Sequence, residues 1–126
     1  MIIRESGEMY LETILRLEKK GQVRSIDIVN ATGYSKPTIS EQMKKFRENG
    51  FIHMDERNFI TLTDKGREIA EKIYERHLVL TDLFIDLGVD PETAEEDACR
   101  IEHYISDATF DKLTERYRER KKKMNS

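Results

Sequence analysis

The segment of residues 25–47, SIDIVNATGYSKPTISEQMKKFR, limits the fold more than any other part of the chain. We expect a short helix capped by Ser25 and a tight turn at Gly33. A second helix should begin after Ser35, with Pro37 in its first turn, where the missing N–H costs nothing. Apolar residues lie where two helices joined by a short turn must touch, so the segment predicts a helix-turn-helix. These apolar residues are Ile26, Val29, Ala31, Ile39, Met43 and Phe46.

The exposed side of the second predicted helix carries hydroxyl, amide and mostly basic side chains. The N-terminus of a helix offers free N–H groups and the positive end of the helix dipole, and both suit phosphate. Side chains farther along the helix can reach base edges in a major groove. The alternative is a solvated face of a structural helix pair. The candidates for contact with DNA are Ser35, Lys36, Pro37, Thr38, Ser40, Glu41, Gln42 and Lys44.

Two short strands are expected directly after this motif, at residues 51–54 and 59–62, on either side of a polar turn. In that position they predict a β-wing. Arg57 at the tip of the turn would reach a phosphate or the minor groove, so it joins the candidates for DNA contact. His53 has no ligand-type neighbour on its strand, and we interpret it as a structural or surface residue.

The stretch CRIEH at residues 99–103 groups three side chains of different chemistry. In a helix Cys99, Glu102 and His103 stand at i, i+3 and i+4 and share one face. A thiol, a carboxylate and an imidazole each offer a lone pair once deprotonated, so the stretch predicts a transition-metal site. The alternative is a solvated face with one free cysteine. An unpartnered thiol on a polar face is open to oxidation, which favours the metal.

Other candidate ligands lie on the remaining predicted helices. An amphipathic helix at residues 7–20 carries Met9 and Glu12 on one flank. A long helix that starts after the wing and runs to about residue 87 places His77 in its apolar stripe. Taken alone, these three residues are more often core filler, a surface glutamate and a satisfied core histidine.

Two helices should follow the long one. Asp90 and Pro91 begin the first, which carries Glu95 and the CRIEH stretch on one side. The second runs from residue 108 to about residue 119 after a cap at Ser106. The basic run RERKKK behind it is expected to be a frayed, solvated tail.

Composition argues against several classes of protein, including membrane-spanning and secreted ones. The chain has 126 residues, a net charge of −3 and one cysteine, which cannot form an internal disulfide, so we expect the reducing cytoplasm. No apolar run approaches the roughly 18 residues of a membrane span, and the N-terminus lacks the apolar core of a signal peptide. The charge excludes a protein that is basic over its whole surface, but it allows a locally basic reading head.

The order of the motifs resembles that of the metal-dependent repressors of the diphtheria toxin repressor and manganese transport regulator (DtxR/MntR) family. The matching stretches cover nearly all of residues 7–113; they are EMYLETILRLE, the helix-turn-helix, LTDKGREIA, the RH of YERHLVL, and DACRIEHYISDATFDKL. The resemblance implies a mainly α fold, with a winged helix-turn-helix DNA-binding domain at residues 1–63. A helical dimerisation and metal-binding domain would occupy residues 64–126, without the SH3-like domain of long members.

The resemblance also implies a function and a ligand set. A homodimer would bind palindromic double-stranded operator DNA when a divalent metal is bound, and would control genes of metal-ion homeostasis. The activating metal would lie between four ligands, and two further residues occupy positions that ligate metal in family members. The four ligands are Met9, Cys99, Glu102 and His103, and the two further residues are Glu12 and His77.

The choice of metal rests on two positions. The manganese-selective branch has carboxylates where this chain has Met9 and Cys99, and the iron-selective branch has methionine and cysteine there. The resemblance therefore implies Fe(II), with Mn(II) as the alternative. Sulfur ligands favour softer metals, which agrees in direction, and Co(II), Ni(II) or Zn(II) would bind in vitro.

One departure from the family concerns a second, ancillary site. Iron-type members use His77 there with a glutamate and a histidine, and this chain has Thr81 and Glu95 at those positions. Glu95 is still a possible ligand, but Thr81 is a poor one. The ancillary site is either lost or rebuilt from Glu12, His77 and Glu95.

Three other functions remain open at this stage. A winged-helix regulator could sense a small organic molecule, with His77 and Cys99 as core or redox residues. A small metalloenzyme could activate water at a Cys/Glu/His site. It would need a substrate cleft and a separate general base, for which the sequence offers no candidate, so we expect neither an enzyme nor an organic substrate. A helix-turn-helix used only for protein contacts is the third.

Overall fold

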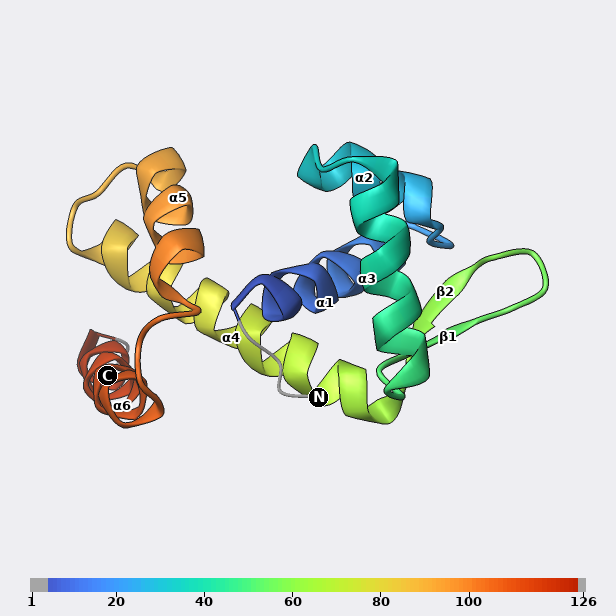
Figure 1. Ribbon diagram of the computed structural model, residues 1–126. Helices are drawn as coiled ribbons and strands as arrows, with labels where there is room; N and C mark the ends of the chain where they lie inside the picture. Colours follow the sequence, from blue (N-terminus) through green and yellow to red (C-terminus); the bar gives the residue numbers. More distant parts are fainter. Residues whose placement is uncertain (1–4, 125–126) are drawn as a thin grey trace. The chain divides into compact units, whose positions relative to one another are not determined.

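The computed structural model describes residues 5–124, and within that range it is mainly helical with one small antiparallel sheet, as predicted (Figure 1). The chain divides into two compact units between Lys72 and Ile73. The domain boundary expected after residue 63 stays a prediction. None of the helices within residues 5–124 is both long and apolar enough to cross a bilayer. The elements are α1 Glu5–Glu18, α2 Ser25–Thr32, α3 Lys36–Glu48, β1 Ile52–Met54, β2 Ile60–Leu62, α4 Asp64–Asp86, α5 Pro91–Ile101 and α6 Asp107–Met124.

Helices α2 and α3 of the first unit form the predicted helix-turn-helix. Gly33 ends α2 with φ of 78°, a left-handed conformation that glycine adopts at little cost, and its N–H bonds to the Val29 carbonyl. The predicted cap at Ser25 is wrong, because Ser25 is the first residue of the helix. Arg24, with an extended backbone just before the helix, is the N-cap instead, and its N–H donates a hydrogen bond of 2.8 Å to the Asp27 carboxylate.

The core between these helices differs from the expected one on the α2 side. Ile28 is fully buried, whereas Ile26 is 44% exposed and Ala31 is exposed. An eight-residue helix buries one narrow stripe, and its rotation places Ile28 at the centre of that stripe. On the α3 side the expected residues are all buried, and the Phe46 ring meets the Phe51 ring edge-on at 5.9 Å.

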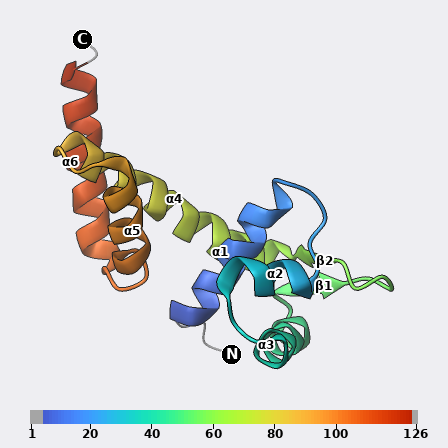
Figure 2. The same cartoon turned by 90° about the horizontal axis from the view of Figure 1, so that it is seen from above.

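The hairpin of β1 and β2 is the predicted wing. The strands pair antiparallel with Ile52 opposite Leu62, and the turn extends away from α3 (Figure 2). The Asp55 carboxylate accepts hydrogen bonds from the N–H groups of Arg57 at 2.8 Å and Phe59 at 2.9 Å. These bonds close the turn, and Arg57 is exposed near its tip.

The start of α4 packs closely against the end of the helix-turn-helix. A Cβ atom on Gly66 would lie 2.1 Å from the Phe51 carbonyl oxygen, so no other residue fits there without a backbone shift. The Thr63 hydroxyl donates a hydrogen bond to the Gly50 carbonyl at 2.6 Å. These contacts fix the wing and the first turns of α4 to one another.

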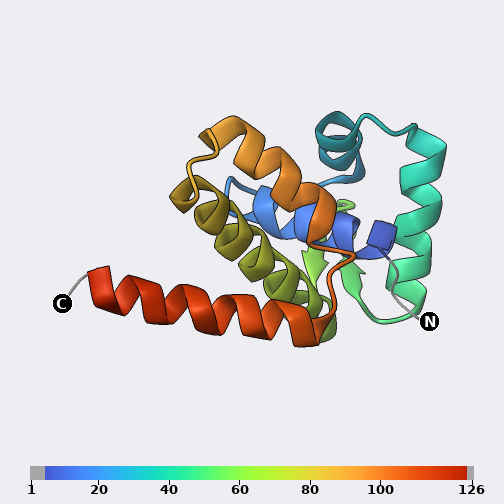
Figure 3. The same ribbon diagram turned by 90° about the vertical axis from the view of Figure 1, so that its left-hand side faces the viewer.

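In the second unit α5 and α6 pack on the second half of α4 (Figure 3). Leu80, Ala98 and Phe110, one from each helix, form the buried apolar cluster. The Asp90 carboxylate caps α5 and accepts a hydrogen bond from the Thr93 N–H at 3.1 Å; this backbone hydrogen bond lowers the pKa of Asp90. The cap sets where α5 begins and hence where its later residues face.

Helix α6 is longer than expected, because it continues to Met124 instead of fraying after residue 119. The basic run forms ion pairs with acidic residues of α4. The expectation of a solvated tail did not include these pairs. The pairs are Arg118 with Glu75 at 3.7 Å, Arg120 with Asp86 at 3.3 Å, and Lys121 with Asp82 at 3.7 Å.

Candidate functional site

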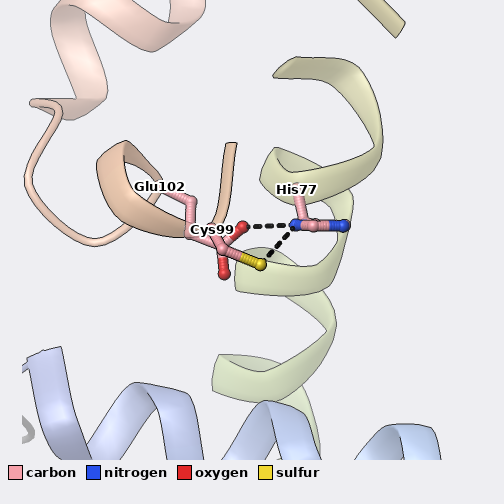
Figure 4. A group of neighbouring side chains, drawn as sticks. All are labelled: His77, Cys99 and Glu102. Carbon is pink, nitrogen blue, oxygen red and sulfur yellow. Dashed lines mark hydrogen bonds and ion pairs between the residues drawn. The ribbon is translucent and has the colours of Figure 1, made fainter. Parts of the chain in front are cut away.

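Three of the predicted metal ligands meet in the second unit, from α4 and from the end of α5 (Figure 4). They are His77, Cys99 and Glu102, and their ligand atoms all lie within 4.8 Å of one another. His77 Nδ1 is 2.9 Å from Glu102 Oε2 and 3.6 Å from Cys99 Sγ. A nitrogen, an oxygen and a sulfur donor therefore converge on one small volume.

Packing between α4 and α5 explains why these side chains meet. Ala94 and Ala98 are fully buried, and such small side chains let α5 approach α4 closely. Cys99 and Glu102 flank this alanine seam. His77 lies in the buried stripe of α4 between Ile73 and Leu80, with 4% of its surface exposed.

Glu102 is the most buried of the predicted ligands, at 1% exposure. A buried carboxylate is costly unless it has partners, and each oxygen of Glu102 faces a different histidine. Its Oε2 faces His77, as above, and its Oε1 lies 3.2 Å from His103 Nε2. Glu95 lies on the other side of His77, with its Oε1 3.9 Å from Nε2 and its side chain 60% exposed.

The expectation that Cys99, Glu102 and His103 share one helix needs a correction. Helix α5 ends at Ile101, and Glu102 and His103 lie in the turn that follows. The turn is held by hydrogen bonds from the N–H groups of Tyr104 and Ile105 to the Ile101 carbonyl, each 3.0 Å long. The positions of Glu102 and His103 therefore depend on this turn as well as on helical spacing.

Met9 and Glu12 belong to α1 in the first unit. The Met9 thioether sulfur is 3.7 Å from the Thr13 hydroxyl, and the Glu12 carboxylate pairs with Arg16 at 3.0 Å. That Met9 and Glu12 contribute to the same metal as residues of the second unit stays a prediction.

The donor set fits a divalent transition metal. Imidazole, thiolate and carboxylate together suit borderline ions better than hard ones such as Mg²⁺ or Ca²⁺. Thr81 lies on α4, and its buried hydroxyl has no hydrogen-bond partner among residues 5–124. His77, Cys99 and Glu102 are therefore the side chains of the second unit best arranged to hold an ion.

Most of the predicted DNA-contact residues lie on α3 or at its N-cap in the first unit, and Arg57 lies on the wing. Ser35 is the N-cap, and its hydroxyl accepts a hydrogen bond from the Thr38 N–H at 3.3 Å and lies 2.8 Å from the Thr38 hydroxyl. Pro37 occupies the first turn, as expected. Glu41 is paired with Lys45 at 3.7 Å, and both side chains are largely exposed. The predicted residues are all exposed apart from Gln42, which is half-buried.

Arg76 is the arginine of the RH pair noted in the family resemblance, but no role was predicted for it. It precedes His77 on α4, and its guanidinium is buried among residues of the turn after α5 and the start of α6. A charged residue inside an apolar stripe, between Ile73 and Leu80, was the available signal.

Two family models together match most of the chain. Residues 3–58 match the N-terminal DNA binding domain of the iron dependent repressors, and residues 63–124 match their metal binding and dimerisation domain. Strand β2 lies between the two matched ranges.

Individual proteins show the same similarity. The chain is 35% identical over 109 residues to the transcriptional regulator MntR of Salmonella typhimurium, which covers 86% of this chain and 69% of that protein. It is 31% identical over 113 residues to the diphtheria toxin repressor of Corynebacterium glutamicum, covering 88% of this chain and 50% of that protein.

A solved structure of a manganese-dependent transcriptional repressor in complex with manganese superposes with a TM-score of 0.78 at 26% identity. The match covers 87% of this chain and 51% of that one. The chain thus spans about half the length of this structure and of the diphtheria toxin repressor relative.

Proposed function

The chain belongs to the iron dependent repressor family of metal-dependent transcriptional repressors, and from that premise we propose how it works. A homodimer binds palindromic operator DNA when a divalent metal, Fe(II) by preference, is bound, and so controls genes of metal-ion homeostasis. The observation that carries this proposal is the convergence of His77, Cys99 and Glu102 in a chain that also contains a winged helix-turn-helix.

The residues of the second unit have separate roles in this proposal. Cys99 supplies a thiolate, His77 supplies Nδ1, and Glu102 supplies the carboxylate between two histidines. A divalent cation bound there supplies the positive charge that stabilises the deprotonated thiol and carboxylate together. Met9, Glu12, His103 and Glu95 are proposed as further ligands on the strength of the family resemblance.

Fe(II) is favoured over Mn(II) because of the sulfur donors. Thiolate and thioether ligands suit softer ions, whereas manganese prefers oxygen ligands. The Cys99 sulfur lies 3.6 Å from His77 Nδ1, beside the Glu102 carboxylate, which supports a role as ligand. Mn(II) is the alternative, because one of the similar solved structures is a manganese-dependent repressor.

The first unit supplies the contact with DNA. The N-terminus of α3 presents Ser35, Lys36 and Thr38 to the phosphate backbone, and Glu41 and Gln42 follow on the same helix for base edges. Arg57 on the wing adds a further phosphate or minor-groove contact. If metal favours the DNA-competent state, DNA must strengthen metal binding by the same factor, and such couplings are typically about 5- to 150-fold.

The first test removes ligands one at a time. DNA that the wild-type protein selects from a random duplex pool in the presence of metal is labelled, and its affinity is measured by fluorescence anisotropy with Fe(II), Mn(II), Zn(II) or a chelator, without oxygen. Glu102→Ala and His103→Ala should lose the metal-dependent gain, about 5- to 150-fold in wild type. Both variants should remain dimers in light scattering.

Glu96→Ala is the matched control, because Glu96 is exposed on α5. It should keep the full metal response. Equal affinity of the wild-type protein for this DNA with metal and with chelator would refute the proposed function.

The second test addresses the choice of metal. The double variant Met9→Asp and Cys99→Glu replaces both sulfur donors with carboxylates, which manganese prefers. Its Mn(II) affinity should rise relative to Fe(II) in a competitive titration. An unchanged ratio of the two affinities would contradict the assignment of these residues to metal selection.

A further inference from the structure

Arg76 carries a buried charge that the proposed function leaves unexplained. It is 6% exposed, and arginine is almost never buried unless its charge and donors are paired. The contacts of its guanidinium therefore indicate what its burial achieves.

All three of these contacts fall on one short segment, the end of the α5–α6 turn and the first turn of α6. Nη1 donates a hydrogen bond to the Ile105 carbonyl at 3.0 Å. Nη2 pairs with the Asp107 carboxylate. The guanidinium carbon also lies 5.0 Å from the centre of the Phe110 ring, over its face.

The same segment positions two of the proposed ligands. Glu102 and His103 lie in the turn between α5 and α6, two to three residues before Ile105. Arg76 donates a hydrogen bond to Ile105 at the C-terminal end of this turn. Its neighbour His77 is hydrogen-bonded to Glu102 at the N-terminal end. Consecutive residues of α4 therefore hold both ends of the turn that carries Glu102 and His103.

We propose that Arg76 is a positioning residue of the metal centre: it fixes the α5–α6 turn so that Glu102 and His103 are held in place beside His77. This inference rests on the proposed function, because it concerns the same site. The groups that orient metal ligands are worth about 10- to 100-fold in metal affinity in other proteins.

The alternative is a purely structural role, in which Arg76 only joins α4 to α6. The two roles differ in what a loss of Arg76 changes. A structural role changes stability alone, whereas a positioning role also changes metal affinity and the spectrum of the bound metal in protein that is still folded.

The test uses Co(II), which has visible ligand-field bands and a near-ultraviolet thiolate band that reports on Cys99. The full chain is titrated with CoCl₂ as wild type, Arg76→Met and Arg120→Met, and folding is checked by far-ultraviolet circular dichroism. Arg120→Met is the matched control, since it removes a different contact between α6 and α4, the pair with Asp86.

Arg76→Met should bind Co(II) about 10- to 100-fold more weakly than wild type, with altered ligand-field bands. Arg120→Met should stay within about twofold, because the Arg120 side chain is 57% exposed and its pair with Asp86 includes no residue of the α5–α6 turn. Unchanged affinity in folded Arg76→Met overturns this inference alone, as does an equal loss in both variants. A wild-type protein that binds no Co(II) overturns the proposed function and this inference with it.

A second variant keeps the inference testable if Arg76→Met does not fold. Asp107→Asn removes the charge that pairs with Arg76. The Asp107 side chain is 66% exposed, so the substitution does not disturb a buried side chain. The contact with the Ile105 carbonyl remains. Charge-assisted hydrogen bonds are roughly twice as strong as neutral ones, and we expect Co(II) affinity to fall about threefold. Unchanged affinity in this variant overturns the inference.

Discussion

The two units of the chain are built on different kinds of core. In residues 5–72 the buried side chains are mostly large and apolar, with Glu12 as the buried charged residue. In residues 73–124 the apolar cluster is small, and three ionisable side chains are buried beside it. The first core includes Leu11, Ile14, Ile28, Ile39, Met43, Phe46 and Phe51, and the ionisable residues of the second are Arg76, His77 and Glu102.

This difference predicts a first unit whose stability does not depend on metal and a second unit whose stability is conditional on metal. Burial of apolar surface stabilises a fold whatever is bound to it. A buried carboxylate and imidazole beside a thiol need suitable charges to be stable, so we expect the stability of the second unit to respond to metal. The first core suits a DNA-binding unit of constant shape, and we expect the second to suit a unit that responds to metal.

The largest effect should come from the apolar core of the first unit. Phe46→Ala removes a fully buried ring and leaves a cavity beside Phe51, so the free energy of unfolding should fall by about 3–5 kcal/mol. Urea unfolding followed by circular dichroism measures the change. It should be the same with metal and with chelator, because Phe46 belongs to the apolar core of the first unit and is not one of the proposed ligands.

Glu48→Ala serves as the control at the exposed end of α3 and should change stability little. If metal recovered most of the loss in Phe46→Ala, the first unit would be conditional as well, and the contrast between the cores would fail.

The next effect is that of metal on the second unit. At about 100 times its Kd, a ligand that binds only the folded state adds about 2.7 kcal/mol. Hydrogen exchange measured by mass spectrometry should be slower with metal than with chelator in peptides from α5 and the turn after it. Peptides from α2 should change less.

His77→Ala is the control for the metal effect, since it removes one donor of the cluster. Equal protection of α2 and α5, or the same protection in His77→Ala, would contradict a metal site whose buried ligands His77 and Glu102 belong to the second core.

Local patterns predicted the elements well, and the misses have physical causes. The turn glycine, the capping serine of α3 and the strand pattern around Asp55 each act within a few residues, so the sequence shows them directly. The rotation of α2 does not act locally. Whether Ile26 or Ile28 faces inward depends on its neighbours in space, which spacing within eight residues does not determine.

Separation along the sequence decided which residues of the site could be predicted from local spacing. Cys99, Glu102 and His103 lie within five residues of one another. The partners of Arg76 lie 29 and 31 residues away, so an arginine in an apolar stripe was the only local sign of its burial. The length of α6 was missed likewise, because the acids that pair with its basic run belong to α4.

The smallest expected effect separates buried from exposed charge within the second unit. Arg120 lies 3.3 Å from Asp86. The Asp86 side chain is 18% exposed, but that of Arg120 is 57% exposed, so water already solvates much of the arginine's charge. Arg120→Met should therefore lower the free energy of unfolding by less than about 1 kcal/mol, measured by urea unfolding in chelator. A loss of about 3 kcal/mol or more, the size expected when a buried pair is broken, would mean that the partly exposed pairs of α6 stabilise this unit. Its buried ionisable residues would then no longer explain why the two cores differ.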